Sequence, residues 1–173
     1  MSMTLIEHIE VGSGGVASIT FSSIPATYTD LYLAISGRNS ANNITGYMAI
    51  NGVATNRSFR ILYGYNGTVG SGSLSDSETF FVVPSSGAAG IFSSSGVYIP
   101  NYAGSNNKSY SSDSVTEWDG TFAWTTIRAG LWSSTDAITS LTLTLGSGGN
   151  FVQYSSATLY GITAGSDGTT TVS

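Results

Sequence analysis

The side chains that could do acid–base chemistry are few, and the only histidine is the first to consider. His8 stands next to Glu7 and close to Glu10, and an acid of this kind can orient an imidazole as a general base. A serine hydrolase would also hold its nucleophile at a sharp turn, but no G-x-S-x-G segment occurs. We therefore expect His8 to be an exposed strand residue.

Three acids surround a tryptophan in the third quarter of the chain. Asp113, Glu117 and Asp119 lie close to Trp118, and two carboxylates beside a sugar-stacking aromatic are what a glycosidase uses. Acids at strand ends and turns are also ordinary, and Asp119 precedes Gly120 in an expected turn. We expect a structural role or a non-catalytic sugar contact here, no catalytic residues, and a protein that is not an enzyme.

Metal and cofactor sites find little support in the sequence. There is no cysteine and no calcium loop of the D-x-[DN]-x-[DN]-G type. The glycine-rich turn at 12–15 lacks the lysine and the helix that follow a phosphate-binding loop. We expect no metal and no cofactor, except that repeated acids at a symmetry axis could still hold an ion.

Composition excludes two further classes. The net charge is −5 and the five basic residues are scattered, so no cluster is present to contact phosphates, and we expect no nucleic-acid partner. No apolar run reaches the about 18 residues of a spanning helix, so we expect no membrane insertion. Residues 1–10 lack the basic start and apolar centre of a signal peptide, which favours synthesis and assembly in a cytoplasm.

The elements that position these residues are expected to be strands, and residues 21–38 show this best. Pro25 locks its own backbone and pushes Ile24 toward extended geometry, which predicts a corner. Leu31, Leu33 and Ile35 then alternate with smaller or more polar residues, and a period of two predicts a strand with one buried face. Leu141, Leu143 and Leu145 alternate with threonine in the same way, so both sets are expected on the inner faces.

The rest of the chain shows the same short strands. They are expected at 4–11, 16–21, 44–51, 57–65, 78–83, 90–99, 115–118, 121–132, 138–145, 151–154 and 157–162. The first of these is expected at a sheet edge or as an arm, 66–77 is expected to be a loop, and 101–114 is ambiguous. No segment has the 3.6-residue spacing of a helix. The sequence predicts an all-β sandwich or barrel with essentially no helix, in one domain (1–162) with a polar tail (163–173).

Two motifs also carry a family resemblance. The first is F-x-x-I-P-x-x-Y-x-D-L-x-L, which begins at Phe21 and is followed by Arg38; the second is ATLYGI at 157–162, preceded by AITSLTLTL and NFVQYSSA. Together they resemble a family of small virion proteins of tailed bacteriophages, described as capsid decoration, cement or tail-fibre proteins. The resemblance covers about Ile6 to Ile162. It implies a single jelly-roll β-sandwich of two antiparallel sheets, and it carries over no catalytic residue.

The residues of the first motif have expected structural roles. Pro25, after Ile24, would set the crossing between the two sheets. Tyr28 would cap the corner through its hydroxyl or simply pack there. Asp30 would accept hydrogen bonds at the start of the strand that carries Leu31, and Arg38 would pair with an acid at its end.

The second motif and the aromatic residues complete the expected contacts. Leu159 should point inward, Tyr160 outward, and Gly161 should permit close approach of another segment. Four aromatic residues are expected either in the core or in contact with a partner or glycan, namely Trp118, Trp124, Tyr102 and Tyr110.

The resemblance implies a function in the virion. We expect a capsid decoration or cement protein on the capsid exterior, bound to the major capsid protein and to itself as a homotrimer, with the N-terminal arm and C-terminal tail touching the shell. The alternative is a receptor- or glycan-binding module of a tail or head fibre that recognises a host surface glycan. A fibre component normally carries a coiled-coil or collagen-like stalk, and these 173 residues contain none.

Overall fold

The computed structural model describes residues 2–118, 120 and 122–164, and two antiparallel sheets account for its regular structure. One sheet has eight strands and the other has four. The described residues hold no α-helix, and a single 3₁₀ turn, Gly146–Gly148, follows the last strand of the small sheet. The predicted all-β sandwich of two antiparallel sheets is therefore confirmed.

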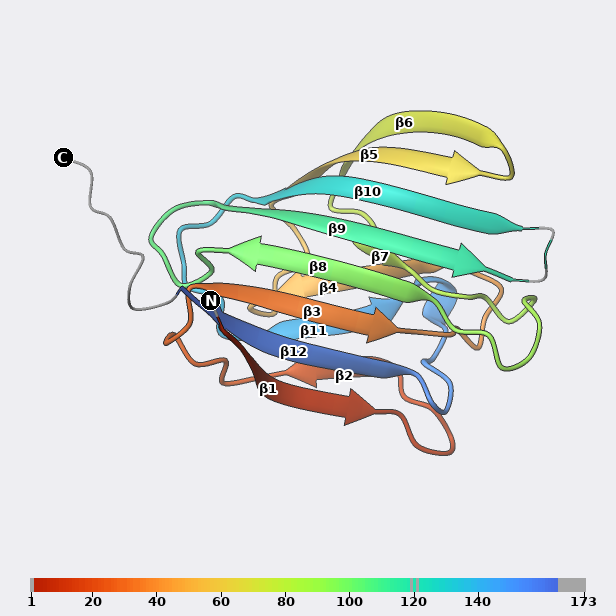
Figure 1. Ribbon diagram of the computed structural model, residues 1–173, viewed down its shortest axis with the longest axis horizontal. Helices are drawn as coiled ribbons and strands as arrows, with labels where there is room; N and C mark the ends of the chain where they lie inside the picture. The colour runs from red at the N-terminus through yellow and green to blue at the C-terminus, as the bar shows by residue number, and fades with distance from the viewer. Residues whose placement is uncertain (1, 119, 121, 165–173) are drawn as a thin grey trace.

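The large sheet has the order β1-β12-β3-β8-β9-β10-β5-β6, and the small sheet has the order β2-β11-β4-β7 (Figure 1). The strands of the large sheet are β1 (Ser2–Glu10), β12 (Ser156–Thr163), β3 (Asp30–Ser36), β8 (Ser94–Pro100), β9 (Lys108–Glu117), β10 (Ala123–Trp132), β5 (Arg57–Tyr65) and β6 (Thr68–Ser75). Those of the small sheet are β2 (Ser18–Phe21), β11 (Leu141–Leu145), β4 (Thr45–Ile50) and β7 (Phe80–Phe81).

The chain passes back and forth between the two sheets. Strands β1, β3, β8 and β12 belong to the large sheet, and β2, β4, β7 and β11 belong to the small one. Two pairs of strands interrupt this alternation, β5–β6 and β9–β10, and both add to the large sheet beside β8. As a result β10, β5 and β6 extend past the small sheet (Figure 1).

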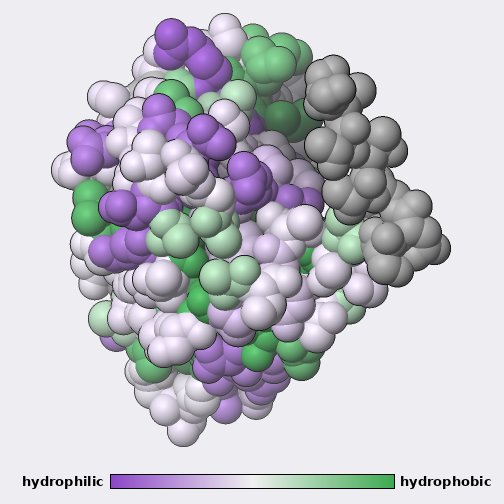
Figure 2. Space-filling view, turned by 90° about the vertical axis from the view of Figure 1, so that its left-hand side faces the viewer, coloured by the Kyte–Doolittle hydropathy of each residue, from purple (hydrophilic) through white to green (hydrophobic). Residues whose placement is uncertain are grey.

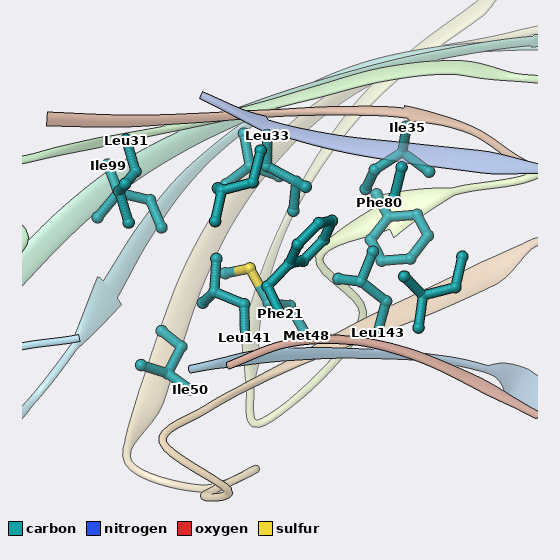
Figure 3. Packing of buried hydrophobic residues seen from close by; sticks show 14 of the residues in the cluster. Phe21, Leu31, Leu33, Ile35, Met48, Ile50, Phe80, Ile99, Leu141 and Leu143 are labelled. Carbon is teal, nitrogen blue, oxygen red and sulfur yellow. The ribbon is translucent and has the colours of Figure 1, made fainter. Parts of the chain in front are cut away.

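The core lies between the sheets where they overlap. Leu31, Leu33 and Ile35 of β3 point toward Leu141 and Leu143 of β11, and Figure 3 shows the two sets facing each other. All five side chains are buried, which stabilises the fold by about 1.5–3 kcal/mol for each. Alternation therefore predicted the inner faces correctly, and Leu145 is buried as well.

The corner at Ile24 and Pro25 closes one end of this core. The Ile24 side chain is buried and its N–H donates to the carbonyl of Thr139 at 3.0 Å. The hydroxyl of Tyr102 donates to the carbonyl of Pro25. These bonds tie the corner to two distant loops, which is why the turn holds its position between the sheets.

The expectation of a loop over 66–77 is wrong. Asn66 and Gly67 have φ of 44° and 81°, the left-handed backbone that a two-residue hairpin turn requires. After this turn β6 pairs with β5 from Thr68 to Ser75. The strand forms because its backbone completes the hydrogen bonds of β5, although its glycines and serines carry no hydrophobic period.

Other boundaries also differ from the sequence prediction, and β7, β8 and β11 begin later than expected, at Phe80, Ser94 and Leu141. The ambiguous segment 101–114 divides into a turn and β9, which begins at Lys108. Residues 151–154 do not form a strand: buried Phe151 makes isolated bridges to Val16 and Asn39, and a turn follows. β12 continues to Thr163, one residue past the expected domain boundary, and tail residues 165–173 lie outside the described residues.

Gly161 offers a sharp test of the packing between the two sequence motifs. A methyl group at this position would lie 2.3 Å from the ring of Tyr28. We expect Gly161→Ala to lower the free energy of unfolding by about 1–3 kcal/mol through overpacking, measured by urea denaturation. The matched control is Gly64→Ala in β5, where nothing lies within 4 Å and no loss is expected. Equal stability of the two variants would contradict this packing.

Candidate functional site

The two sequence motifs form one structural unit. β3 and β12 pair in antiparallel register, with Tyr32 opposite Tyr160 and Leu31 opposite Gly161. The ring of Tyr28 packs on Gly161, so the close approach expected at this glycine is present and packing is a role of Tyr28. Leu159 is buried and Tyr160 is half-buried, as expected for inward and outward positions.

Asp30 accepts hydrogen bonds at the start of β3, as predicted. One carboxylate oxygen accepts from the Tyr98 hydroxyl at 2.7 Å, and the other accepts from the backbone N–H of Asn101 at 2.9 Å. The bond to the Asp30 carboxylate, together with partial burial and charge repulsion, raises the pKa of Tyr98. This carboxylate therefore links β3, β8 and the loop that follows β8.

The expectation that Arg38 pairs with an acid is wrong. Its guanidinium donates to the backbone carbonyls of Gly87 at 2.6 Å and Ala88 at 2.7 Å, with longer bonds to those of Ser85 and Ile91. A cluster of loop carbonyls supplies the negative partial charge that a carboxylate would have supplied. Arg38 thus holds the loop between β7 and β8 in place.

Two of the four aromatic residues expected either in the core or in contact with a partner are buried, so for them the core alternative holds. Tyr102 is fully buried beneath the Pro25 corner. Tyr110 is 3% exposed, packs edge-on against Phe59 at 5.9 Å, and lies over Gly130. Desolvation raises the pKa of Tyr110. The sequence left segment 101–114 ambiguous, and it did not show which part of the chain would cover these two rings.

Trp118 and Trp124 instead belong to a partly exposed group that we call the aromatic shelf: Tyr63, Tyr65, Trp118, Phe122 and Trp124. Trp124 stacks on Tyr65 with ring centroids 4.3 Å apart, and Trp118 stacks on Phe122 at 5.5 Å. Strand alternation places Trp124 and Tyr65 on the inner side of the large sheet, in the part that extends past the small one. The sequence analysis did not name the other shelf residues, Tyr63, Tyr65 and Phe122. The alternation within 57–65 and 121–132 was the only sequence signal for them.

The acids near Trp118 do not gather around it. Asp113 and Glu117 are exposed on the outer side of β9, whereas alternation places Trp118 on the inner side. Asp119 lies outside the described residues. His8 is exposed in β1, as predicted, with its Nδ1 2.7 Å from the hydroxyl of Thr158.

A buried arginine lies next to the shelf on the inner side of β10. Arg128 is 1% exposed, its guanidinium lies 4.3 Å from the ring centre of Phe81, and Nη1 donates to the Thr126 hydroxyl at 2.8 Å. Its Nε and Nη2 have no hydrogen-bond partner among the described residues. Burial lowers the pKa of Arg128 to about 10, partly offset by Glu78.

The outer side of the large sheet carries an exposed apolar group that sequence analysis missed. We call it the outer patch: Leu62, Val69, Val115 and Ile127. Leu62 and Ile127 lie directly opposite each other on β5 and β10, and each is 62% exposed. In the sequence, each of these residues alternates with residues of the opposite side of its strand. The same pattern is typical of a half-buried strand, so it did not indicate that these side chains are exposed. By contrast, the end of the molecule where β1 begins shows apolar and polar residues interspersed (Figure 2).

Comparisons with known proteins assign neither a family nor a function to this chain. No family model, curated protein or solved structure matches the chain. Within the described residues, no three His, Cys, Asp or Glu side chains are grouped so that they could hold a metal ion. None of the described residues form a helix with the length and hydropathy to span a bilayer.

The two buried arginines should respond differently to replacement by methionine. Arg57 donates to the carbonyls of Met48 and Ala54, so we expect Arg57→Met to cost about 2–4 kcal/mol of unfolding free energy. Arg128 leaves two nitrogens unpaired, so Arg128→Met should change stability by about 1 kcal/mol or less. Chemical denaturation measures both, and a larger loss for Arg128→Met would contradict this description.

Proposed function

We propose that this chain is a structural protein of a tailed-phage virion, a decoration or cement protein that binds the outside of the major capsid shell, as a trimer. The observation that carries the proposal is the pairing of β3 with β12. The two motifs that resemble this protein family are neighbours in one sheet, joined by Tyr28 and Gly161. The two motifs that resemble this family therefore belong to one packed unit of the structure, and are not two separate segments that happen to be similar.

The order of the strands supports the jelly-roll form of this proposal. Without the two added strand pairs, the large sheet has the order β1-β12-β3-β8 and the small sheet has β2-β11-β4-β7. With those pairs left out, consecutive strands along the chain lie in opposite sheets, apart from β4 and β7, which both belong to the small sheet. Two nested Greek keys produce such an order, and they define a jelly roll. The pairs β5–β6 and β9–β10 are then additions to a common scaffold.

The β1 edge is our candidate for the contact with the shell. β1 is an outermost strand, and Met3 and Leu5 on it are 56% and 55% exposed. One such edge buries little apolar area, but many copies bound to a symmetric shell multiply a weak contact into firm attachment. This accords with the expectation that the N-terminal segment touches the shell.

The test is binding to purified capsids that lack this protein. We expect the wild-type chain to sediment with such shells at hundreds of copies per particle, whereas a few dozen or fewer copies would indicate a fibre. Met3→Ser with Leu5→Ser should weaken binding by about tenfold or more through lost apolar burial. Tyr154→Asn, at a side chain 65% exposed on a turn that bonds to Val11 past the opposite end of β1 from Met3 and Leu5, is the control. No binding of the wild-type chain to any shell would contradict the proposal.

A glycan-binding module of a fibre is the second candidate, and the aromatic shelf favours it. Stacked, partly exposed rings are suited to the apolar faces of sugars, which aromatic side chains recognise in many proteins. Trp118 also donates its indole N–H to Thr116 at 3.2 Å, which fixes one ring of the shelf.

A glycan array distinguishes this second candidate from the first. If the shelf binds sugars, wild-type protein retains specific glycans and Trp118→Ala loses at least about nine-tenths of that signal, since stacking on one ring contributes about 1–2 kcal/mol. Tyr154→Asn should again leave binding unchanged. An array on which the wild-type chain retains nothing would remove this candidate.

A further inference from the structure

We infer that the outer side of the added strands β9, β10, β5 and β6 is an interface with a second copy of this chain, packed face to face about a two-fold axis. The inference concerns assembly of the protein with itself and stands apart from its proposed place on a virion. It rests on the outer patch, on the charges beside that patch, and on the shape of the surface between them.

The apolar part of the face consists of four exposed aliphatic side chains, one on each of four adjacent strands. Leu62 and Ile127 form a central ridge, with Val69 84% exposed on one side and Val115 47% exposed on the other. The small sheet does not cover this side, because it lies on the opposite side of the large sheet. An exposed aliphatic group of this kind marks a contact surface.

The exposed positive charge of the chain lies on the same face. All five Lys and Arg residues lie in the described part, and Arg57, Lys108 and Arg128 are buried while Arg38 is bound to loop carbonyls. Arg60 is thus the one basic side chain exposed to solvent, in a protein of net charge −5. It stands on β5 beside the central ridge. A partner for this face should therefore present an acid, and this chain is itself acidic.

The acid is already present at the matching position. Asp113, Ile127 and Leu62 form one row across β9, β10 and β5, and Arg60 lies in the next row on β5. Strand spacing puts Asp113 and Arg60 about 12 Å apart, too far for an ion pair within one molecule. Neither side chain makes an ion pair with any described residue of its own chain.

A two-fold axis can place Asp113 and Arg60 of one copy opposite Arg60 and Asp113 of the other. If the axis lies parallel to the faces and perpendicular to the line from Asp113 to Arg60, it carries each Asp113 onto the Arg60 of the other copy. Two ion pairs then flank an apolar centre formed by Ile127 and Leu62 from both molecules. An isologous contact of this kind repeats every interaction twice, which is the usual arrangement in dimers.

The shape and size of the face fit such a contact. A hollow of about 540 Å³ lies beside the ridge, with small residues such as Ala129, Ser71 and Gly72 in its lining, and it can receive the ridge of the second copy. Four strands spaced about 4.8 Å apart and paired over about seven residues give a face of about 19 by 23 Å. Two such faces bury about 900 Å², which is the size of a weak, reversible contact between two proteins.

Charge reversal in the full chain tests the proposal. We expect light scattering or sedimentation equilibrium to show an even number of wild-type copies, two or, if trimers also form, six. Arg60→Asp and Asp113→Arg should each weaken the two-fold contact by about tenfold or more, because each places two like-charge pairs at the interface. The double variant Arg60→Asp/Asp113→Arg restores both ion pairs and should regain wild-type assembly.

Two controls separate the interface from general effects. Ile127→Ser removes apolar area without charge and should also halve the assembly. Because the side chain is exposed in a single molecule, its unfolding midpoint should equal that of the wild type when both are diluted until they are monomeric. Glu10→Arg, on the far edge strand β1, should leave assembly as in the wild type. A wild-type monomer, a trimer whose mass no variant alters, or a double variant no better than the single ones would overturn the inference, and would assign the face to another partner.

Discussion

The fold depends on apolar packing between β3 and the small sheet. β3 lies inside the large sheet, paired with β12 on one side and β8 on the other, so its register is set by two neighbours. Its alternating aliphatic residues face β11 across the core. A shift of one residue would turn Leu31, Leu33 and Ile35 outward, so the register of the strand and the burial of the core stabilise each other.

The added strands have a different physical basis from the rest. Opposite β11 and β4 the inner side of the large sheet is aliphatic, but opposite β7 and past it the sheet carries Arg128, hydroxyl groups and the aromatic shelf. These side chains have partners there, because the Arg128 guanidinium and the Trp124 ring both pack on Phe81 of β7 and the Ser112 hydroxyl donates to the carbonyl of Thr79. The outer patch lies on the other side of the same added strands, so these strands carry both of the surfaces suited to binding.

Sequence periodicity predicted the fold class and the inner face, since every second residue of β3 and β11 is leucine or isoleucine. It failed for β6, where glycine and serine give no contrast and the strand forms through the backbone of its neighbour. It could not decide which of Trp118, Trp124, Tyr102 and Tyr110 lie in the core, because burial depends on which segment lies above each ring. The diagonal of Arg60 and Asp113 arises from the pairing of β9, β10 and β5, and strand register of that kind is not encoded locally.

The hairpin β5–β6 has a thermodynamic consequence that follows from its place in the sheet. β6 has a neighbour on one side only, and the small sheet does not extend beneath it. Its glycines and serines bury little apolar area, so the free energy that opposes its local opening is smaller than the free energy of global unfolding. Amide hydrogens of β6 should therefore exchange with solvent well before those of β3, and a molecule that docks on this region would slow them selectively.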